Sequence, residues 1–190
     1  MAPYHSKIRT LRRCQSRTLS DVAGQCGFTV SFLSKIESGK TSPPLATLAK
    51  IATALGISLA DLIDGSGTGG TVHTTAQKLG ARQATRTEKG YSFHMLASER
   101  GGKLIQPFLM TAERGKVKPS ILSHRGEEFI YVLAGRMRYR VGDTTYTLGP
   151  GDSLYFNSEE SHDFSPISKG VRYLAVFAER EVPKSKSSAK

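Results

Sequence analysis

The stretch LSDVAGQCGFTVSFLSKIESGK, residues 19–40, has the spacing of two short helices joined by a tight turn. Ala23 is a small residue at the point where the helices would cross, and Gly27 permits the sharp turn between them. Ser20 and Thr29 are hydroxyl residues at the expected helix starts, where their side chains can cap free backbone N–H groups. This stretch therefore predicts a pair of closely crossed helices.

The second helix of the pair has two unlike sides. Leu33 and Ile36 share the side that anchors the helix to a core. The opposite side is left open, and it carries Val30, Ser31, Phe32, Ser34 and Lys35. An open helix face on a rigid support can enter the major groove of DNA, so we expect this helix to read bases.

Helical spacing continues on both sides of residues 19–40. Ile8 and Leu11 fall on one face of an earlier helix. An apolar stripe and a last short helix follow Pro43-Pro44, and their apolar residues are Leu45, Leu48, Ile51, Leu55, Leu59 and Leu62. Five short helices in so short a stretch predict an all-α bundle.

These residues resemble the lambda repressor and Cro-like helix-turn-helix family, also called the Xre family. The matching motifs are I-R-x-L-R at 8–12, G-F-T-x-S-x-L-S-x-I-E-x-G at 27–39 and P-x-x-x-T-L-x-K-I-A-x-A-L-G at 43–56. The match runs over residues 6–63 without a gap. The resemblance implies a five-helix lambda-repressor-like bundle that binds a double-stranded DNA operator.

The resemblance also implies roles for single residues. Those implied to face base edges are Thr29, Ser31, Phe32 and Lys35, and those implied to contact phosphates are Ser34 and Lys40. Many members of the family have Gln early in both helices, where this chain has Asp21 and Val30. The resemblance therefore implies DNA binding without giving the operator sequence.

Charge and cysteine content agree with such a role. The 190-residue chain has a formal net charge of +11, and residues 1–63 hold eight Lys or Arg against three acidic residues. A basic balance favours polyanionic partners such as DNA. The two cysteines do not make a disulfide framework, and no apolar run suits a signal peptide or a membrane span. We therefore expect a cytoplasmic protein with no membrane partner.

The second half of the chain changes to strand alternation. Turn signals at Gly142-Asp143 and Pro150-Gly151-Asp152 separate short apolar runs across residues 91–178, which predicts an antiparallel barrel or sandwich. Residues Phe129–Leu133 are apolar on both faces, so their second face needs a cover. A second copy of the chain is a reasonable cover, and we expect a homodimer.

Composition divides the chain into four parts. A helix-turn-helix domain spans residues 1–63, and a Gly, Ser and Thr-rich linker with a lead-in spans residues 64–90. An all-β domain spans residues 91–180, and a basic polar tail follows at residues 181–190.

Two histidines and a glutamate in the all-β domain have the spacing of metal ligands. His124 and Glu128 are four residues apart, so on a strand they share one face, and His162 follows a second strand. Two imidazoles and one carboxylate suit a divalent ion, with Fe, Zn, Mn and Ni as candidates. The alternative is a polar pocket in which the same side chains bind an organic ligand.

The segments SHRGEEFIYVLAG at 123–135 and GPGDSLYFNSEESHDF at 149–164 look like the two motifs of the cupin superfamily. That resemblance implies a double-stranded β-helix barrel. Leu122 stands where the family has its first His, so a four-ligand site is lost and the three-ligand site remains. The residues that could line or rim an effector pocket are Tyr91, Arg125, Tyr139 and Tyr155.

Two functions fit these features. The first is a transcription regulator whose cupin domain binds a small effector, a metal, or both, and so shifts the DNA-binding units between two geometries. The second is a mononuclear non-haem iron enzyme, because the order of domains and the two-His, one-Glu set resemble the hydroxypropylphosphonate epoxidase family. The more complete DNA-binding pattern and the basic charge favour the regulator.

Overall fold

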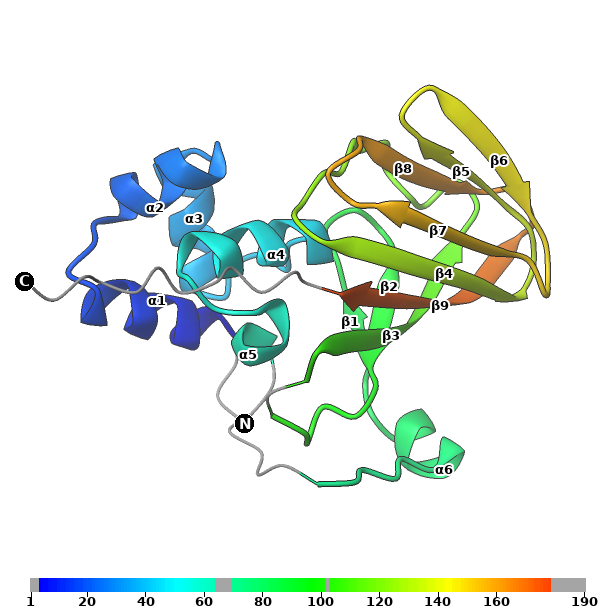
Figure 1. Ribbon diagram of the computed structural model, residues 1–190, viewed down its shortest axis with the longest axis horizontal. Coiled ribbons are helices and arrows are strands. Elements are labelled where there is room, and N and C mark those ends of the chain that lie inside the picture. Colours follow the sequence, from blue (N-terminus) through cyan, green and yellow to red (C-terminus); the bar gives the residue numbers. More distant parts are fainter. Residues whose placement is uncertain (1–3, 64–69, 102, 179–190) are drawn as a thin grey trace, which may run out of the picture.

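A computed structural model describes residues 4–63, 70–101 and 103–178, and it shows a helical half beside a β half (Figure 1). The helical half holds α1 (Tyr4–Cys14), α2 (Leu19–Cys26), α3 (Val30–Glu37), α4 (Leu45–Ala54) and α5 (Leu59–Ile63). The tail predicted at 181–190 and the first part of the predicted linker, 64–69, lie outside the described residues. Among the residues described, no helix is long and apolar enough to span a membrane.

A sixth helix, which the sequence analysis did not predict, lies in the lead-in to the β half. This helix is α6 (Ala76–Gly80), and the two-residue strand β1 (Thr85–Arg86) follows it. Thr75 starts α6 because its hydroxyl accepts a hydrogen bond from the backbone N–H of Lys78 at 3.2 Å. None of its residues is buried, so the helix carries no apolar stripe for sequence analysis to detect.

Caps at three positions set the ends of α2 and the start of α3. Thr29 caps α3 as predicted, but Thr18 rather than Ser20 caps α2. The Thr18 hydroxyl accepts from Asp21 N at 3.1 Å, and the Asp21 carboxylate accepts from Thr18 N at 2.7 Å. Gly27 ends α2 with φ 69°, a left-handed conformation that suits glycine. Asp21 therefore takes part in the cap that starts α2.

The core of the bundle contains one buried ion pair among its apolar side chains. The fully buried apolar residues that α1 to α5 contribute include Ile8, Val22, Leu33, Ile36, Leu48 and Ile51. Arg12 on α1 donates to Glu37 on α3 through Nε at 2.6 Å and Nη2 at 2.8 Å. A two-point bond between a guanidinium and a carboxylate fixes the angle between the helices that carry them. It therefore fixes how α3 is presented.

The β half folds into two antiparallel sheets. The larger sheet has the order β1-β2-β3-β9-β4-β7 and the smaller has the order β6-β5-β8. Their strands after β1 are β2 (Ser92–Met95), β3 (Ile105–Glu113), β4 (Glu127–Ala134), β5 (Met137–Val141), β6 (Thr144–Leu148), β7 (Ser153–Asn157), β8 (His162–Pro166) and β9 (Gly170–Ala178). The inner faces enclose a core, and β5 shows the alternation of a strand with one buried face, because Met137, Tyr139 and Val141 are buried.

Gly135 lets the chain turn tightly between β4 and β5. Its φ is 78°, and a Cβ at this position would lie 2.1 Å from the carbonyl oxygen of Gly170. Only glycine fits such a close approach, which explains why a glycine stands at this turn, seven residues after Glu128.

The first turn of α4 packs against the end of the barrel that faces the bundle (Figure 1). Leu45 is 2% exposed, and its backbone N–H donates to the Tyr91 hydroxyl at 3.2 Å. The chain just before α4 is held too, because Glu88 N donates to the Ser42 carbonyl at 2.9 Å and the Thr41 hydroxyl donates to the Glu88 carboxylate at 2.7 Å. The helical half and the barrel thus share an interface.

Arg12→Ala is expected to destabilise the helical half by about 3–5 kcal/mol, because it leaves the Glu37 carboxylate buried without its partner. Urea unfolding followed by far-ultraviolet circular dichroism measures this loss. Arg13→Ala is the matched control, since Arg13 is the exposed neighbour on the same helix and should lose little. Equal stability of the two variants would contradict a structural role for the ion pair.

Candidate functional site

The open side of α3 carries the residues predicted to read DNA. Thr29, Ser31, Ser34, Lys35 and Lys40 are exposed, and Val30 is 45% exposed. Glu37, the acidic residue of this helix, is turned inward to Arg12, so no carboxylate of α3 faces solvent. The exposed face therefore presents hydroxyls, one apolar side chain and cations, which suits base edges and phosphates.

Phe32 differs from the prediction that it stands free on this side. It is half-buried, and its ring meets the ring of Phe28 edge-on at 5.5 Å. The large ring gains more by folding back over the α2–α3 turn than by standing in water. Packing against Phe28 and the core is therefore part of its role.

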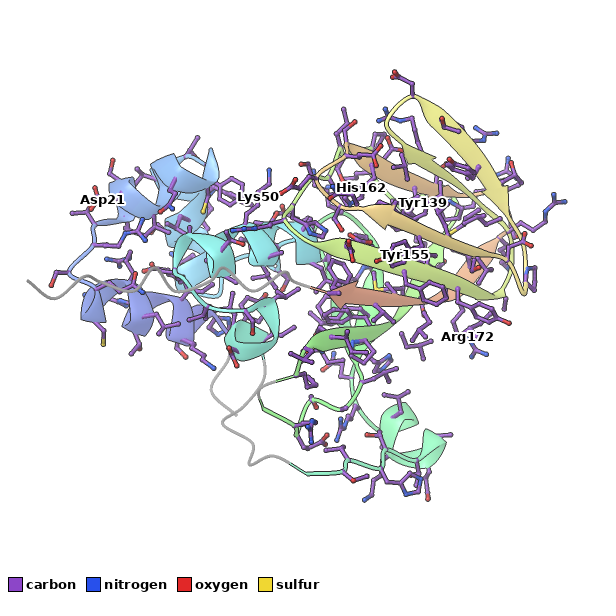
Figure 2. All side chains as sticks on the ribbon, viewed as in Figure 1. Asp21, Lys50, Tyr139, Tyr155, His162 and Arg172 are labelled. Carbon is purple, nitrogen blue, oxygen red and sulfur yellow. The ribbon has the colours of Figure 1, made fainter. Side chains whose placement is uncertain are left out.

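The three predicted metal ligands meet inside the barrel. Glu128 lies on β4 and His124 lies in the loop before it. His162 is the first residue of β8 (Figure 2). All three side chains are buried, and one ligand atom from each lies within 4.8 Å of the others. Glu128 Oε1 is 2.6 Å from His124 Nε2 and 3.3 Å from His162 Nε2.

Backbone carbonyls orient both imidazole rings. His162 Nδ1 lies 2.8 Å from the Glu160 carbonyl, and His124 Nδ1 lies 3.3 Å from the Arg125 carbonyl. A carbonyl accepts only from an N–H, so these contacts suit a proton on each Nδ1, and each Nε2 would be the ligand atom once a metal displaced any proton it carries.

The centre of this cluster fits a divalent cation. His162 Nε2 is buried and has no hydrogen-bond partner among the described residues, although Glu128 Oε1 is within ion-pair range. Two imidazole nitrogens and a carboxylate oxygen converge on one small space, and they repel one another unless a proton or a metal ion lies between them. The donor set is that of a facial two-His, one-carboxylate metal site. A bound divalent ion would act there as a Lewis acid.

Electrostatics in the cluster favour the charged forms. Burial acts to raise the pKa of Glu128, but the neighbouring His124 and His162 outweigh it and lower the pKa to about 2. Burial likewise acts to lower the pKa of His162, yet the Glu128 carboxylate raises it overall. Glu128 is therefore an anion at neutral pH, as a metal ligand must be.

The space next to Glu128 is small and is closed by the helical half. A cavity of about 20 Å³ is lined by Glu128, by barrel side chains and by Leu45 and Ala46 of α4. A volume of this size holds about one water molecule. This cavity, as the described residues form it, has no room for an organic effector.

The predicted effector-pocket residues fall in three different places. Tyr91 and Tyr139 line the closed cavity, and Tyr139 lies 3.4 Å from the Glu128 carboxylate. Arg125 instead lines a separate cleft between the domains. The prediction for Tyr155 was wrong, since it is 64% exposed on the outer face of the larger sheet and bonds to Glu127 (Figure 2). Its neighbour Phe156 points inward, and strand alternation then forces Tyr155 outward.

Sequence reasoning missed several residues of this region. Leu45 and Ala46 wall the cavity from the other domain, and Tyr173 lines it from β9. The alternation of β9 was a usable signal for Tyr173, because Val171, Tyr173 and Ala175 are its buried positions. No pattern within the helical half marks Leu45 as a contact of the barrel.

Comparison with known proteins agrees with both halves. A helix-turn-helix family model matches residues 8–62, and a cupin domain model matches residues 108–177. The HTH-type transcriptional regulator PuuR of Escherichia coli (strain K12) is 24% identical over 173 residues, which span 87% of this chain and 88% of that protein.

Two solved structures are similar to the chain over most of its length. An HTH_3 family transcriptional regulator from Vibrio cholerae superposes with a TM-score of 0.70 at 22% identity, over 93% of this chain and 94% of that one. Hydroxypropylphosphonic acid epoxidase from S. wedmorenis superposes with a TM-score of 0.49 at 20% identity, over 92% of this chain and 96% of that one. The first likeness supports the two-domain fold described above.

Proposed function

We propose that this chain, which matches a helix-turn-helix model in one half and a cupin domain model in the other, is a sequence-specific DNA-binding regulator whose cupin domain responds to a divalent metal and a small effector. The observation that carries this proposal is the exposed, acid-free face of α3 on a helix fixed by the Arg12–Glu37 ion pair. Its partner would be a double-stranded operator. The site of action would be the cytoplasm, where such DNA lies.

A homodimer is part of the proposal. Tyr131 and Leu133 on β4 are 39% and 43% exposed, and they share the outer face of the larger sheet with Tyr155 on the edge strand β7. Contiguous apolar side chains of this kind mark an interaction surface. A two-fold dimer through this face would place two α3 helices against half-sites about one DNA turn apart, ~34 Å.

The cupin triad supports a metal in the same molecule. We propose that His124, Glu128 and His162 bind one divalent ion, with Fe, Zn, Mn and Ni as the candidates. The ion would neutralise the buried carboxylate and hold β4 and β8 at a fixed spacing, which stabilises the barrel that α4 rests on.

An iron-dependent oxidoreductase is the second candidate, and the two-His, one-carboxylate set is the observation that favours it. The cavity beside Glu128 argues against it, because its volume of about 20 Å³ does not hold a substrate-sized molecule. Oxygen consumption that requires Fe(II), in a protein that fails to bind DNA even at low salt, would reverse this ranking.

Lys35→Ala is expected to weaken operator binding about tenfold, because a cation at a base edge or phosphate is worth one to three kcal/mol. Gel retardation across a salt series measures both the affinity and its steep fall with salt. Lys169→Ala is the control, since Lys169 is an exposed cation next to the start of β9, at the end of the barrel away from the bundle. Equal losses in the two variants, or no DNA binding by the wild type, would contradict the proposal.

Tyr131→Lys is expected to convert the dimer into a monomer, since it places a charge in the middle of the proposed interface. Sedimentation velocity measures the mass of each species. Tyr146→Lys is a matched control, because Tyr146 is also 39% exposed but lies on the smaller sheet. A monomeric wild type, or a dimer unaffected by Tyr131→Lys, would contradict this interface.

Protein stripped with a chelator is expected to take up one equivalent of Co(II) per chain and to gain thermal stability as it does so. His162→Ala should lose this uptake while it retains operator binding, because α3 lies in the other domain. Glu127→Gln is the control, since the neighbouring Glu127 bonds to Tyr155 outside the barrel. Co(II) uptake by His162→Ala at wild-type affinity would place the metal elsewhere.

A further inference from the structure

We propose that the cleft between the helical bundle and the barrel binds a small organic anion, and that this anion is the effector. The second statement rests on the proposed regulator function, whereas the first concerns binding alone. The cleft has a volume of about 310 Å³. That is within the lower range of small-molecule sites, which often lie at domain interfaces.

Both domains contribute walls to the cleft. Lys50 and Thr53 come from α4 and Gln25 from the end of α2, while Ser123, Arg125 and Glu159 come from two loops of the barrel. Figure 2 shows Lys50 on α4 between the bundle and the barrel. A molecule bound here therefore contacts the DNA-reading half and the cupin half at once.

The charge of the cleft selects an anion. Lys50 and Arg125 face it from opposite domains, and neither forms an ion pair or donates a side-chain hydrogen bond to another described residue. Arg17 stands behind the wall, where it donates to the Ala54 carbonyl and to Gln25 Oε1, each at 2.5 Å. Two cations left without a partner across one concave site are suited to a carboxylate or phosphate group.

Neutral groups around the cations can orient the rest of the ligand. Arg17 already occupies Gln25 Oε1, so the Gln25 amide nitrogen remains available as a donor. The Thr53 hydroxyl lies on the same wall as Lys50. A carboxylate in the cleft, that of Glu159, disfavours a polyanion and favours a small ligand with a single anionic group or two.

Of the cavity beside Glu128 and the cleft between the domains, the cleft has more room for an organic molecule. Its cavity beside Glu128 holds about one water molecule, whereas the cleft is some fifteen times larger. His124 connects the cleft with Glu128, because it lines the cleft and bonds to Glu128 through Nε2. A ligand in the cleft would thus contact His124, one of the three proposed metal ligands.

An anion held between the domains would favour the arrangement in which α4 packs against the barrel. Only in that arrangement do both Lys50 and Arg125 face the anion. The bundle would then be fixed relative to the barrel, and through the barrel relative to the second copy of the chain. The spacing of the two α3 helices on DNA would depend on the anion.

Titration of the DNA-free protein with inorganic phosphate and with succinate tests the site, at constant ionic strength and with amide chemical shifts as the readout. The Thr53 and Ser123 amides should shift saturably with at least one of the anions, and the Lys169 amide should not. Lys50→Gln and Arg125→Gln should each weaken binding about tenfold, as expected for the loss of one charge-assisted bond. Lys50→Arg should retain it, and Lys116→Gln, on a distant turn, is the matched control.

Absence of a saturable shift with either anion would overturn the proposal, as would equal binding by all four variants. Loss of operator affinity in Lys50→Gln and Arg125→Gln, without any small-anion binding, would instead assign these cations to DNA phosphates. Because the titration contains no DNA, its outcome is independent of whether the protein binds an operator. Failure of the anion site and failure of the regulator proposal are therefore distinguishable.

Discussion

The contact between Leu45 and the barrel mouth is the interaction on which the rest of the structure depends. It buries an apolar side chain and satisfies the first free N–H of α4 through the Tyr91 hydroxyl. Around it, the hydrogen bonds of Glu88 with Ser42 and Thr41 hold the same two halves together. With it, the barrel cavity is closed, the interdomain cleft exists, and the core that supports α3 is tied to the cupin half.

This arrangement couples the two domains, because one helix packs in the core of the bundle and also against the barrel. Leu45 and Ala46 wall the cavity beside Glu128 and also belong to the helix that packs against α2. A ligand that binds more tightly when α4 packs against the barrel therefore favours that arrangement. The free energy of the shift is no larger than the difference in the ligand's binding free energy for the two arrangements. The metal cluster and the cleft meet at His124, so the two kinds of ligand act on neighbouring parts of one interface.

Local chemistry was predictable from the sequence, and contacts between distant segments were not. The α2–α3 pair, the cap at Thr29 and the convergence of His124, Glu128 and His162 follow from spacing within short stretches. Thr18 was missed as the cap because the partner that identifies it, Asp21, was considered only as a DNA-facing position. Tyr155 was misplaced because its neighbour Phe156 is equally apolar, so that only the register of β7 decides which ring points inward. Leu45 looks like an ordinary core residue of the bundle, and its place in the barrel mouth depends on how two domains meet.

The most direct test of the account is repeated selection of bound fragments from a random pool of duplex DNA by the purified, full-length protein. The account predicts enrichment of a palindrome whose half-sites are centred about one helical turn apart, since two α3 helices related by a two-fold axis would read it. A pool that emerges without any enriched sequence would contradict the claim that this exposed helix face recognises DNA.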